Sequence, residues 1–170
     1  MKLAVMVVLF LLAIVLQTTV FSSFVLWGSY PDLLTVLVVN LGILNGSTEG
    51  AWLGFAAGLL QDLLLGRFIG LHAVSLALVG YISGAASQRL YRDNYIVPPF
   101  FTLLGTWLGR TLVLVGMALF GKTVPISVQM IRVIGLSGLY SALVTIVIYR
   151  RFAKLNDRIA YLDEWVRRTG

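Results

Sequence analysis

Long apolar runs, separated by short polar or glycine-containing breaks, dominate the chain. The runs lie near residues 3–26, 32–46, 50–65, 70–87, 95–120 and 128–149, and the breaks fall at 28–31, 45–49, 66–70, 88–94 and 121–125. None of the runs alternates between apolar and polar residues, and about 20 apolar residues suffice for a helix to cross a bilayer. The pattern therefore predicts an all-α integral membrane protein with about six transmembrane helices in one bundle.

The break between the second and third runs leaves two arrangements open. Residues 45–49 read Asn-Gly-Ser-Thr-Glu, and each flanking run is shorter than the about 20 residues that cross a bilayer unaided. The alternative is one long tilted helix over residues 32–65, which gives five spans. That helix would hold Ser47, Thr48 and Glu49 at membrane depth, at a cost of a few kcal/mol. We therefore expect six spans.

Composition supports the membrane assignment and narrows the chemistry. The 170 residues are 59% hydrophobic and 12% charged, too few polar side chains to cover the surface of a water-soluble domain. The absence of cysteine excludes disulfides and thiolate metal sites, and a single histidine argues against a multi-histidine metal centre. The sequence also lacks the motifs of hydrolases, phosphate loops and metalloproteases. We expect neither a cofactor nor an enzymatic activity.

Basic residues favour one orientation in the membrane. The formal net charge is +6, and much of the excess lies in residues 150–170. Lys and Arg in short loops favour the cytoplasm, and six spans place Lys2, Arg89 and Arg92 on the same side as this segment. We expect a transmembrane domain over residues 1–149 and a basic cytoplasmic tail over 150–170. Both termini would then face the cytoplasm, and we expect no nucleic acid as partner.

The tail carries apolar residues at helical spacing. These are Phe152, Leu155, Ile159, Leu162 and Val166. The spacing predicts a short amphipathic C-terminal helix. Its basic residues would attract anionic lipids by about 1 kcal/mol each when close to the membrane surface; they are Arg150, Arg151, Lys154 and Arg158. Docking on a cytoplasmic partner is the alternative.

Polar residues within the apolar runs are the candidate site. They are Gln17, Asp62, His72, Arg110 and Arg132. An ionisable group at membrane depth costs about 2.5–3.5 kcal/mol, so each one requires a reason. With the N-terminus inside, all five fall toward the outer leaflet. We hypothesise a shared outward-facing polar pocket for a partner or ligand, with Asp62 paired to Arg110 or Arg132. The alternative is a structural ion pair, with the remaining residues reaching interfacial water.

Small residues and a proline mark further candidate contacts. Glycines recur at four-residue spacing at Gly50, Gly54, Gly58, Gly80 and Gly84. In lipid, small residues allow close backbone approach, so we expect tight helix packing there, with a groove for a partner helix as the alternative. Pro31 and Asp32 open the second run. They suit a helix start, where Asp32 would cap free amides or be contacted by a partner.

One stretch resembles a known family. It reads Pro31-Asp32-Leu33-Leu34, Gly46, Gly50, Gly54-Phe55, Gly58-Leu59-Leu60-Gln61-Asp62 and Gly70-Leu71, and continues to Gly80-Tyr81 and Gly84. This pattern resembles the rod shape-determining protein MreD family. The resemblance implies a fold similar to the S components of energy-coupling-factor transporters. It also implies a non-enzymatic subunit of the bacterial elongation machinery that binds MreC directly and, indirectly, MreB, RodA and its transpeptidase in peptidoglycan synthesis.

Two other functions remain open. One is a substrate-binding S component of a vitamin or metal-ion uptake transporter. Such a subunit should carry an A-x-x-x-A face on its first helix, and this chain has only Ala4 and Ala13 there. The other is a small channel or exporter built as a homo-oligomer. An even number of spans with a one-sided charge bias does not require the dual topology that would favour it. We therefore expect the structural and interaction subunit.

Overall fold

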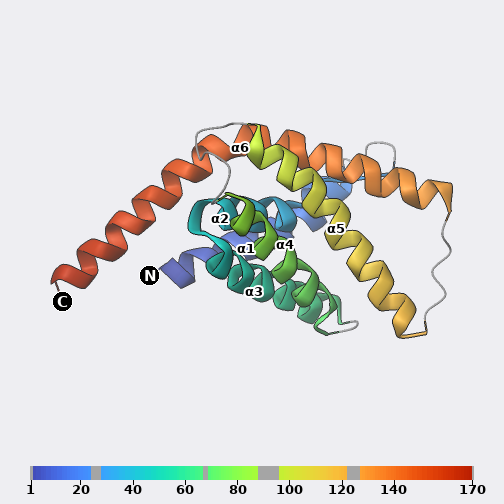
Figure 1. The fold of residues 1–170 in the computed structure, drawn as a ribbon, viewed down its shortest axis with the longest axis horizontal. Helices are drawn as coiled ribbons and strands as arrows, with labels where there is room; N and C mark the ends of the chain where they lie inside the picture. Colours follow the sequence, from blue (N-terminus) through green and yellow to red (C-terminus); the bar gives the residue numbers. More distant parts are fainter. Residues whose placement is uncertain (1, 24–27, 67–68, 88–95, 122–126, 170) are drawn as a thin grey trace.

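The structure is helical throughout the part of the chain that it describes. The computed structural model describes residues 2–23, 28–66, 69–87, 96–121 and 127–169. Within these residues it contains α1 (Lys2–Ser23), α2 (Leu33–Asn45), α3 (Ser47–Leu65), α4 (Leu71–Ser87), α5 (Val97–Leu119) and α6 (Val128–Thr169) (Figure 1). The all-α prediction is confirmed. Helices α1 to α5 begin and end within a few residues of the predicted runs, whereas α6 begins at the predicted residue and continues well past Tyr149. The break expected at 88–94 lies outside the described residues, as do residues 122–125 of the break expected at 121–125.

Two helical segments are long and apolar enough to cross a bilayer by length and composition. They are Val97–Leu119 and Val128–Tyr149. In the most apolar 18-residue stretch of each, only 22% is buried inside the protein. Apolar segments that face outward in this way suit lipid better than water. The apolar segments Met6–Thr19, Leu33–Asn45 and Leu71–Ser87 are shorter. Six crossings therefore stay a prediction.

The chain reverses direction between α2 and α3. Gly46 has a φ of 96°, a conformation that glycine adopts without steric cost. Beyond this turn α3 folds back onto α2, so a Cβ placed on Gly50 would lie 2.8 Å from the Cα of Gly42. In one continuous helix these two residues would be about 12 Å apart. The single long helix considered as an alternative is therefore wrong.

Helices α3 and α4 pack backbone against backbone. A Cβ on Gly50 would lie 2.5 Å from the carbonyl oxygen of Gly80, and one on Gly84 would lie 2.5 Å from the carbonyl carbon of Gly46. Added Cβ atoms on Gly54 and Gly58 would likewise meet α4 backbone atoms at distances that real Cβ atoms do not show. The spaced glycines are therefore used for contacts within the bundle, and close packing in lipid supplies van der Waals energy here.

Helix α2 lies at the centre of the bundle. It contacts all five other helices, and 11 of its 13 residues, Leu33 to Ile43, are buried. Its sequence is apolar around the whole circumference, which is typical of a helix enclosed by others. In Figure 1 α2, α3 and α4 run close together, with α5 and α6 to one side and α1 behind.

Helix α6 continues through the basic tail. It is one helix of 42 residues from Val128 to Thr169, about 63 Å long at about 1.5 Å per residue. The separate short C-terminal helix that we expected is therefore corrected to an extension of the sixth helix. No glycine or proline follows Tyr149 before Gly170, so nothing in the sequence interrupts it. The C-terminal part of α6 extends beyond the other helices (Figure 1).

Candidate functional site

A non-helical segment before α2 is held against α6 by hydrogen bonds. The Ser29 hydroxyl donates to the Val133 carbonyl (3.0 Å), the Ser137 hydroxyl donates to the Tyr30 carbonyl (2.8 Å), and the Asp32 amide donates to the Ser141 hydroxyl (2.9 Å). These α6 positions are four residues apart, so they share one face of the helix. Non-helical backbone is tolerated at membrane depth where other protein groups form hydrogen bonds with its amides and carbonyls. The serines of α6 therefore fix the segment that carries Tyr30 and Asp32.

The start of α2 receives two side-chain caps. Asp32 is the N-cap, and its Oδ1 accepts a hydrogen bond from the Thr35 amide at 3.1 Å. Gln17 on α1 accepts from the Leu33 amide at 3.2 Å through Oε1. Pro31 is buried beside them. These contacts satisfy amides that a helix start leaves free, and they bring α1 to the same end of the bundle.

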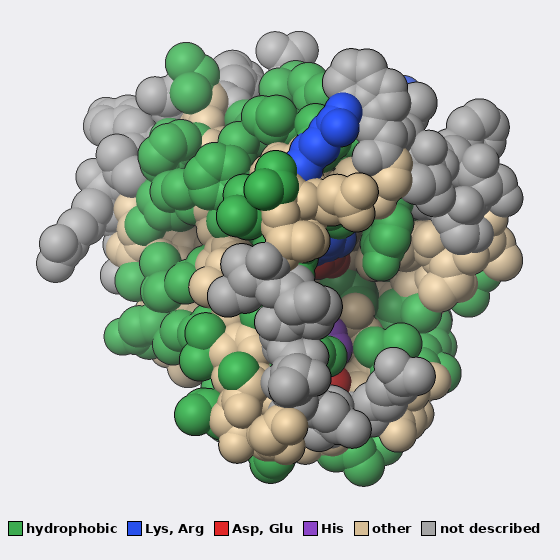
Figure 2. All heavy atoms as spheres, turned by 90° about the vertical axis from the view of Figure 1, so that its right-hand side faces the viewer, with side chains coloured by type: hydrophobic (Ala, Val, Ile, Leu, Met, Phe, Trp, Pro, Cys, Tyr) green, Lys and Arg blue, Asp and Glu red, His purple; other side chains and the backbone are tan. Residues whose placement is uncertain are grey.

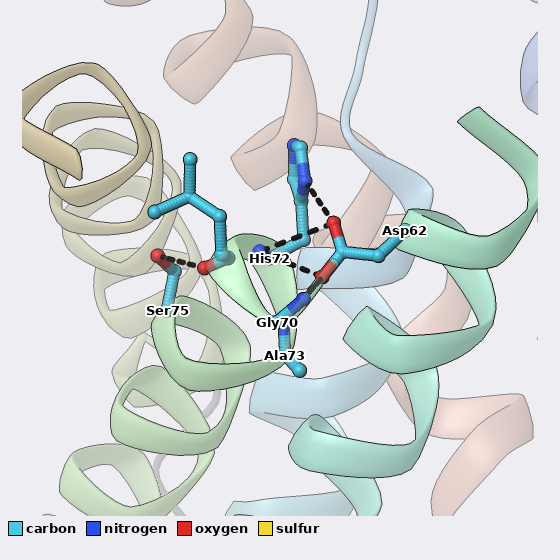
Figure 3. A network of polar contacts seen from close by, with 6 residues as sticks. Asp62, Gly70, His72, Ala73 and Ser75 are labelled. Atoms are coloured by element: carbon cyan, nitrogen blue, oxygen red, sulfur yellow. Dashed lines mark hydrogen bonds and ion pairs between the residues drawn. The ribbon is translucent and has the colours of Figure 1, made fainter. Parts of the chain in front are cut away.

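Asp62 binds the first turn of α4. Its side chain is fully buried, and Oδ2 accepts hydrogen bonds from the amides of Gly70 (2.8 Å), His72 (3.1 Å) and Ala73 (3.2 Å). Oδ1 lies 2.6 Å from Nδ1 of His72. Figure 3 shows these groups converging from α4 on the carboxylate at the end of α3. A carboxylate is well placed there, because free amides and the helix dipole make a helix N-terminus electropositive.

The expected pairing of Asp62 with an arginine is corrected. The hydrogen bonds just described occupy the carboxylate, and α4 begins next to it because α3 and α4 are packed so closely. Arg110 instead lies over the ring of Tyr30, with its guanidinium carbon 5.5 Å from the ring centroid. Among the described residues no ion pair joins Arg110 to Asp62. Arg132 is exposed on α6, whereas Asp62 has no exposed surface.

A cavity of about 560 Å³ lies where α3 and α5 end and α4 and α6 begin. Its polar lining includes Gln17, Asp32, Gln61, His72, Arg110 and Gln129, and its apolar wall includes Leu76, Val113, Leu114, Met130 and Ile134. Figure 2 shows a hollow on this face, with basic, acidic and histidine side chains visible between apolar ones. A volume of this size and a mostly apolar lining with a few polar groups are typical of small-molecule sites.

A second hollow adjoins this cavity. It measures about 510 Å³ and shares Gln17, Tyr30, Gln61 and His72 with the first. Its remaining lining is largely apolar, from Ile14 on α1, Leu34 on α2, and Leu64 and Leu65 on α3. Leu64 and Leu65 are exposed on the outside of the bundle. The polar cavity therefore adjoins an apolar hollow that reaches the outer surface beside α1 and α3.

Comparison with known families decides the identity of the chain. The family model for the rod shape-determining protein MreD matches residues 1–159. The chain belongs to the MreD family. No curated protein and no solved structure matches the chain significantly. Membership makes this a membrane protein that acts in bacterial cell shape, as the resemblance in the sequence implied. The similarity to S components stays a prediction.

The structure brings together part of the site expected for this MreD-family chain. Gln17, His72 and Arg110 line the cavity, Asp62 lies behind His72, and Arg132 is not a lining residue. The basic positions Arg150, Arg151, Lys154 and Arg158 follow on α6, away from the cavity end. Whether any of these residues contacts a partner or a lipid stays a prediction.

Sequence reasoning missed several lining residues of the MreD-family cavity. Tyr30, Gln61 and Gln129 were not among the candidate residues, and Asp32 was assigned only to a cap or partner contact. Gln61 and Gln129 are uncharged amides in or beside apolar runs, which was a usable signal because buried amides need partners. Tyr30 could not be found from sequence, since its place depends on the contact between residues 28–32 and α6.

Proposed function

We propose that this protein is a non-enzymatic membrane subunit of the bacterial rod complex, which binds MreC and helps to organise lateral peptidoglycan synthesis. The observation that carries the proposal is the MreD family match over residues 1–159. Through MreC the protein would act with MreB, RodA and its transpeptidase. The role of such a subunit is to present a shaped helical surface within the membrane, which the close-packed bundle supports.

The exposed face of α6 is the proposed docking site for the membrane helix of MreC. Most helical glycines of the described chain meet a neighbouring helix, but a Cβ on Gly135 would meet nothing within 4 Å. Its flanking residues Ile131 and Leu139 are 63% and 49% exposed. Glycine lowers helix stability by about 1 kcal/mol relative to alanine. A glycine on an outer helix face is therefore best explained by close approach of another helix, as small residues allow in lipid.

Co-purification tests this function and the docking face together. The protein is purified with MreC from bacterial membranes in mild detergent, as the parent chain, as Gly135→Leu and as the control Ala118→Leu. Ala118 is exposed near the end of α5, so the control adds the same bulk to another outward face. We expect MreC with the parent chain and Ala118→Leu, and at least about 10-fold less with Gly135→Leu, which should fold normally. Retention by all three would refute the docking face, and no MreC with the parent chain would refute the function.

The orientation proposed for this subunit has both termini in the cytoplasm of the inner membrane. Helix α6 is about 63 Å long. The hydrocarbon core of a bilayer is about 30 Å thick, so the helix is about twice as long as the core. Because α6 continues past its apolar segment Val128–Tyr149, the residues Arg150, Arg151, Lys154 and Arg158 would leave the lipid at the end opposite Val128. The basic residues then reach the anionic inner leaflet, which supports the positive-inside assignment.

A further inference from the structure

The Arg110 guanidinium forms no ion pair with any described residue. Its guanidinium lies over Tyr30 at 5.5 Å, and in the described ranges it forms no hydrogen bond and no ion pair. Arginine carries five N–H donors and stays charged in proteins. It lies on α5, inside an apolar segment long enough to cross a bilayer, and it lines the cavity. An arginine without an ion pair in such a place indicates an anionic group that enters the cavity.

The other polar groups define the remainder of that ligand. Asp32 also lines the cavity; Oδ1 accepts from the Thr35 amide, and Oδ2 has no partner among the described residues. His72 uses Nδ1 toward Asp62, and its Nε2 likewise has no partner in that part of the chain. One cation and one anion on the wall suit a head group that carries both an oxyanion and a positively charged donor.

The adjoining apolar hollow indicates that the remainder of the ligand is apolar. It shares His72 and Gln17 with the cavity and opens past Leu64 and Leu65. A fully water-soluble ligand would leave this surface without an apolar partner. An amphiphile would fill both parts, with its head in the cavity and its alkyl chain in the hollow toward the lipid.

We propose that the protein binds a zwitterionic phospholipid-like amphiphile, with a phosphate oxyanion at Arg110, an ammonium group at Asp32 and an alkyl chain between α1 and α3. The Asp62–His72 pair fixes the imidazole at the cavity wall, where Nε2 contacts the head group. Arginine suits phosphate because its planar donors form paired hydrogen bonds with two oxygens. This inference goes beyond the proposed function and does not require MreC.

Three probes separate the head group from the chain. The purified protein in maltoside micelles is titrated with dioctanoyl phosphatidylethanolamine, with dioctanoylglycerol, which lacks the phosphate, and with phosphoethanolamine, which lacks the chains. Native mass spectrometry gives bound stoichiometry and affinity, and the melting temperature gives an independent readout. We expect saturable 1:1 binding of the first probe, and affinities at least about 10-fold lower for the other two, because each lacks one anchoring group.

Variants test the residues. Arg110→Gln should weaken binding of the phospholipid at least about 10-fold, since it removes a charged hydrogen-bond donor. Without lipid it should melt at or above the temperature of the parent chain, because it removes a cation that no described group neutralises. Arg132→Gln is the matched control, an arginine on α6 outside the cavity lining. Asp32→Asn keeps a good N-cap residue and should weaken the same probe.

Several results would overturn the proposal. Unchanged affinity of Arg110→Gln would remove the anion anchor, and an equal loss with Arg132→Gln would indicate general surface electrostatics. Equal binding of phosphoethanolamine would remove the alkyl chain from the site, and equal binding of dioctanoylglycerol would remove the phosphate. MreC retention is measured separately, so failure here is distinguishable from failure of the proposed function.

Discussion

The Asp62–His72 contact should behave as one energetic unit, and Arg110 should not belong to it. The carboxylate accepts three backbone amides and lies 2.6 Å from the imidazole Nδ1. Asp62→Asn retains the shape of the side chain but has one acceptor oxygen and a donor group where the second oxygen was. Asp62→Ala retains no acceptor at all. The two substitutions therefore separate loss of charge from loss of every hydrogen bond at this position.

The expected losses of unfolding free energy follow from the buried hydrogen-bond donors around Asp62. A hydrogen bond to a charged group contributes about 1.5–3 kcal/mol, and a buried donor left unpaired costs about 1–3 kcal/mol. Asp62→Asn weakens several bonds and should lower the free energy of unfolding by about 3 kcal/mol. Asp62→Ala leaves three amides and the imidazole without their acceptor and should cost about 5 kcal/mol. The control Asp32→Asn, which keeps the N-cap, should change the free energy of unfolding by less than about 0.5 kcal/mol.

Double-mutant cycles test whether Asp62 is paired with His72 or with Arg110. Unfolding is followed by circular dichroism in mixed micelles as the fraction of denaturing detergent rises. Asp62→Ala combined with His72→Ala should show a coupling of about 1.5–3 kcal/mol, because each single variant already removes the shared contact. Asp62→Asn combined with Arg110→Gln should be additive within about 0.5 kcal/mol. Additivity with His72 and coupling with Arg110 would refute the geometry described for Asp62.

Two further predictions concern packing and orientation. Gly54→Leu should lower the free energy of unfolding by about 3 kcal/mol or more in the same assay, since its Cβ would overlap the α4 backbone at Leu76; an unchanged value would mean that α3 and α4 are not in backbone contact. Alkaline phosphatase fused to either terminus should be inactive and a fluorescent protein there should be active, because both termini are predicted to face the cytoplasm; phosphatase activity at either end would contradict that orientation.

Much of the fold could be predicted because the signals are local. Apolar runs and their glycine or proline breaks determine where helices begin and end, so α1 to α5 lie close to the predicted runs. The turn at Gly46 was predictable for the same reason, since burying the polar residues that follow it would be costly. The change from lipid to water after Tyr149 is not a helix stop signal, and α6 therefore continues where a separate helix was expected.

For the candidate site, the sequence predicted which residues take part but not which groups they contact. A polar residue in an apolar run is visible in the sequence, and three of the five such residues line one cavity. The partner of each is not visible, because it depends on which helix ends meet. Asp62 was assigned to an arginine on the basis of charge alone. Three of the groups that it binds are backbone amides, which every residue except proline contributes and which therefore leave no mark in the sequence.

The glycine contact and the cavity depend on each other. Close approach of α3 and α4 leaves only a short connection between Leu65 and Leu71, so the end of α3 faces the first turn of α4. That geometry buries Asp62 against α4 amides and points His72 into the cavity lining. If a larger residue at Gly58 moved the helices apart, the carboxylate would lose its amide donors and the imidazole its orientation. The small residues of α3 are therefore needed to shape the polar cavity, although none of them contributes a polar group to it.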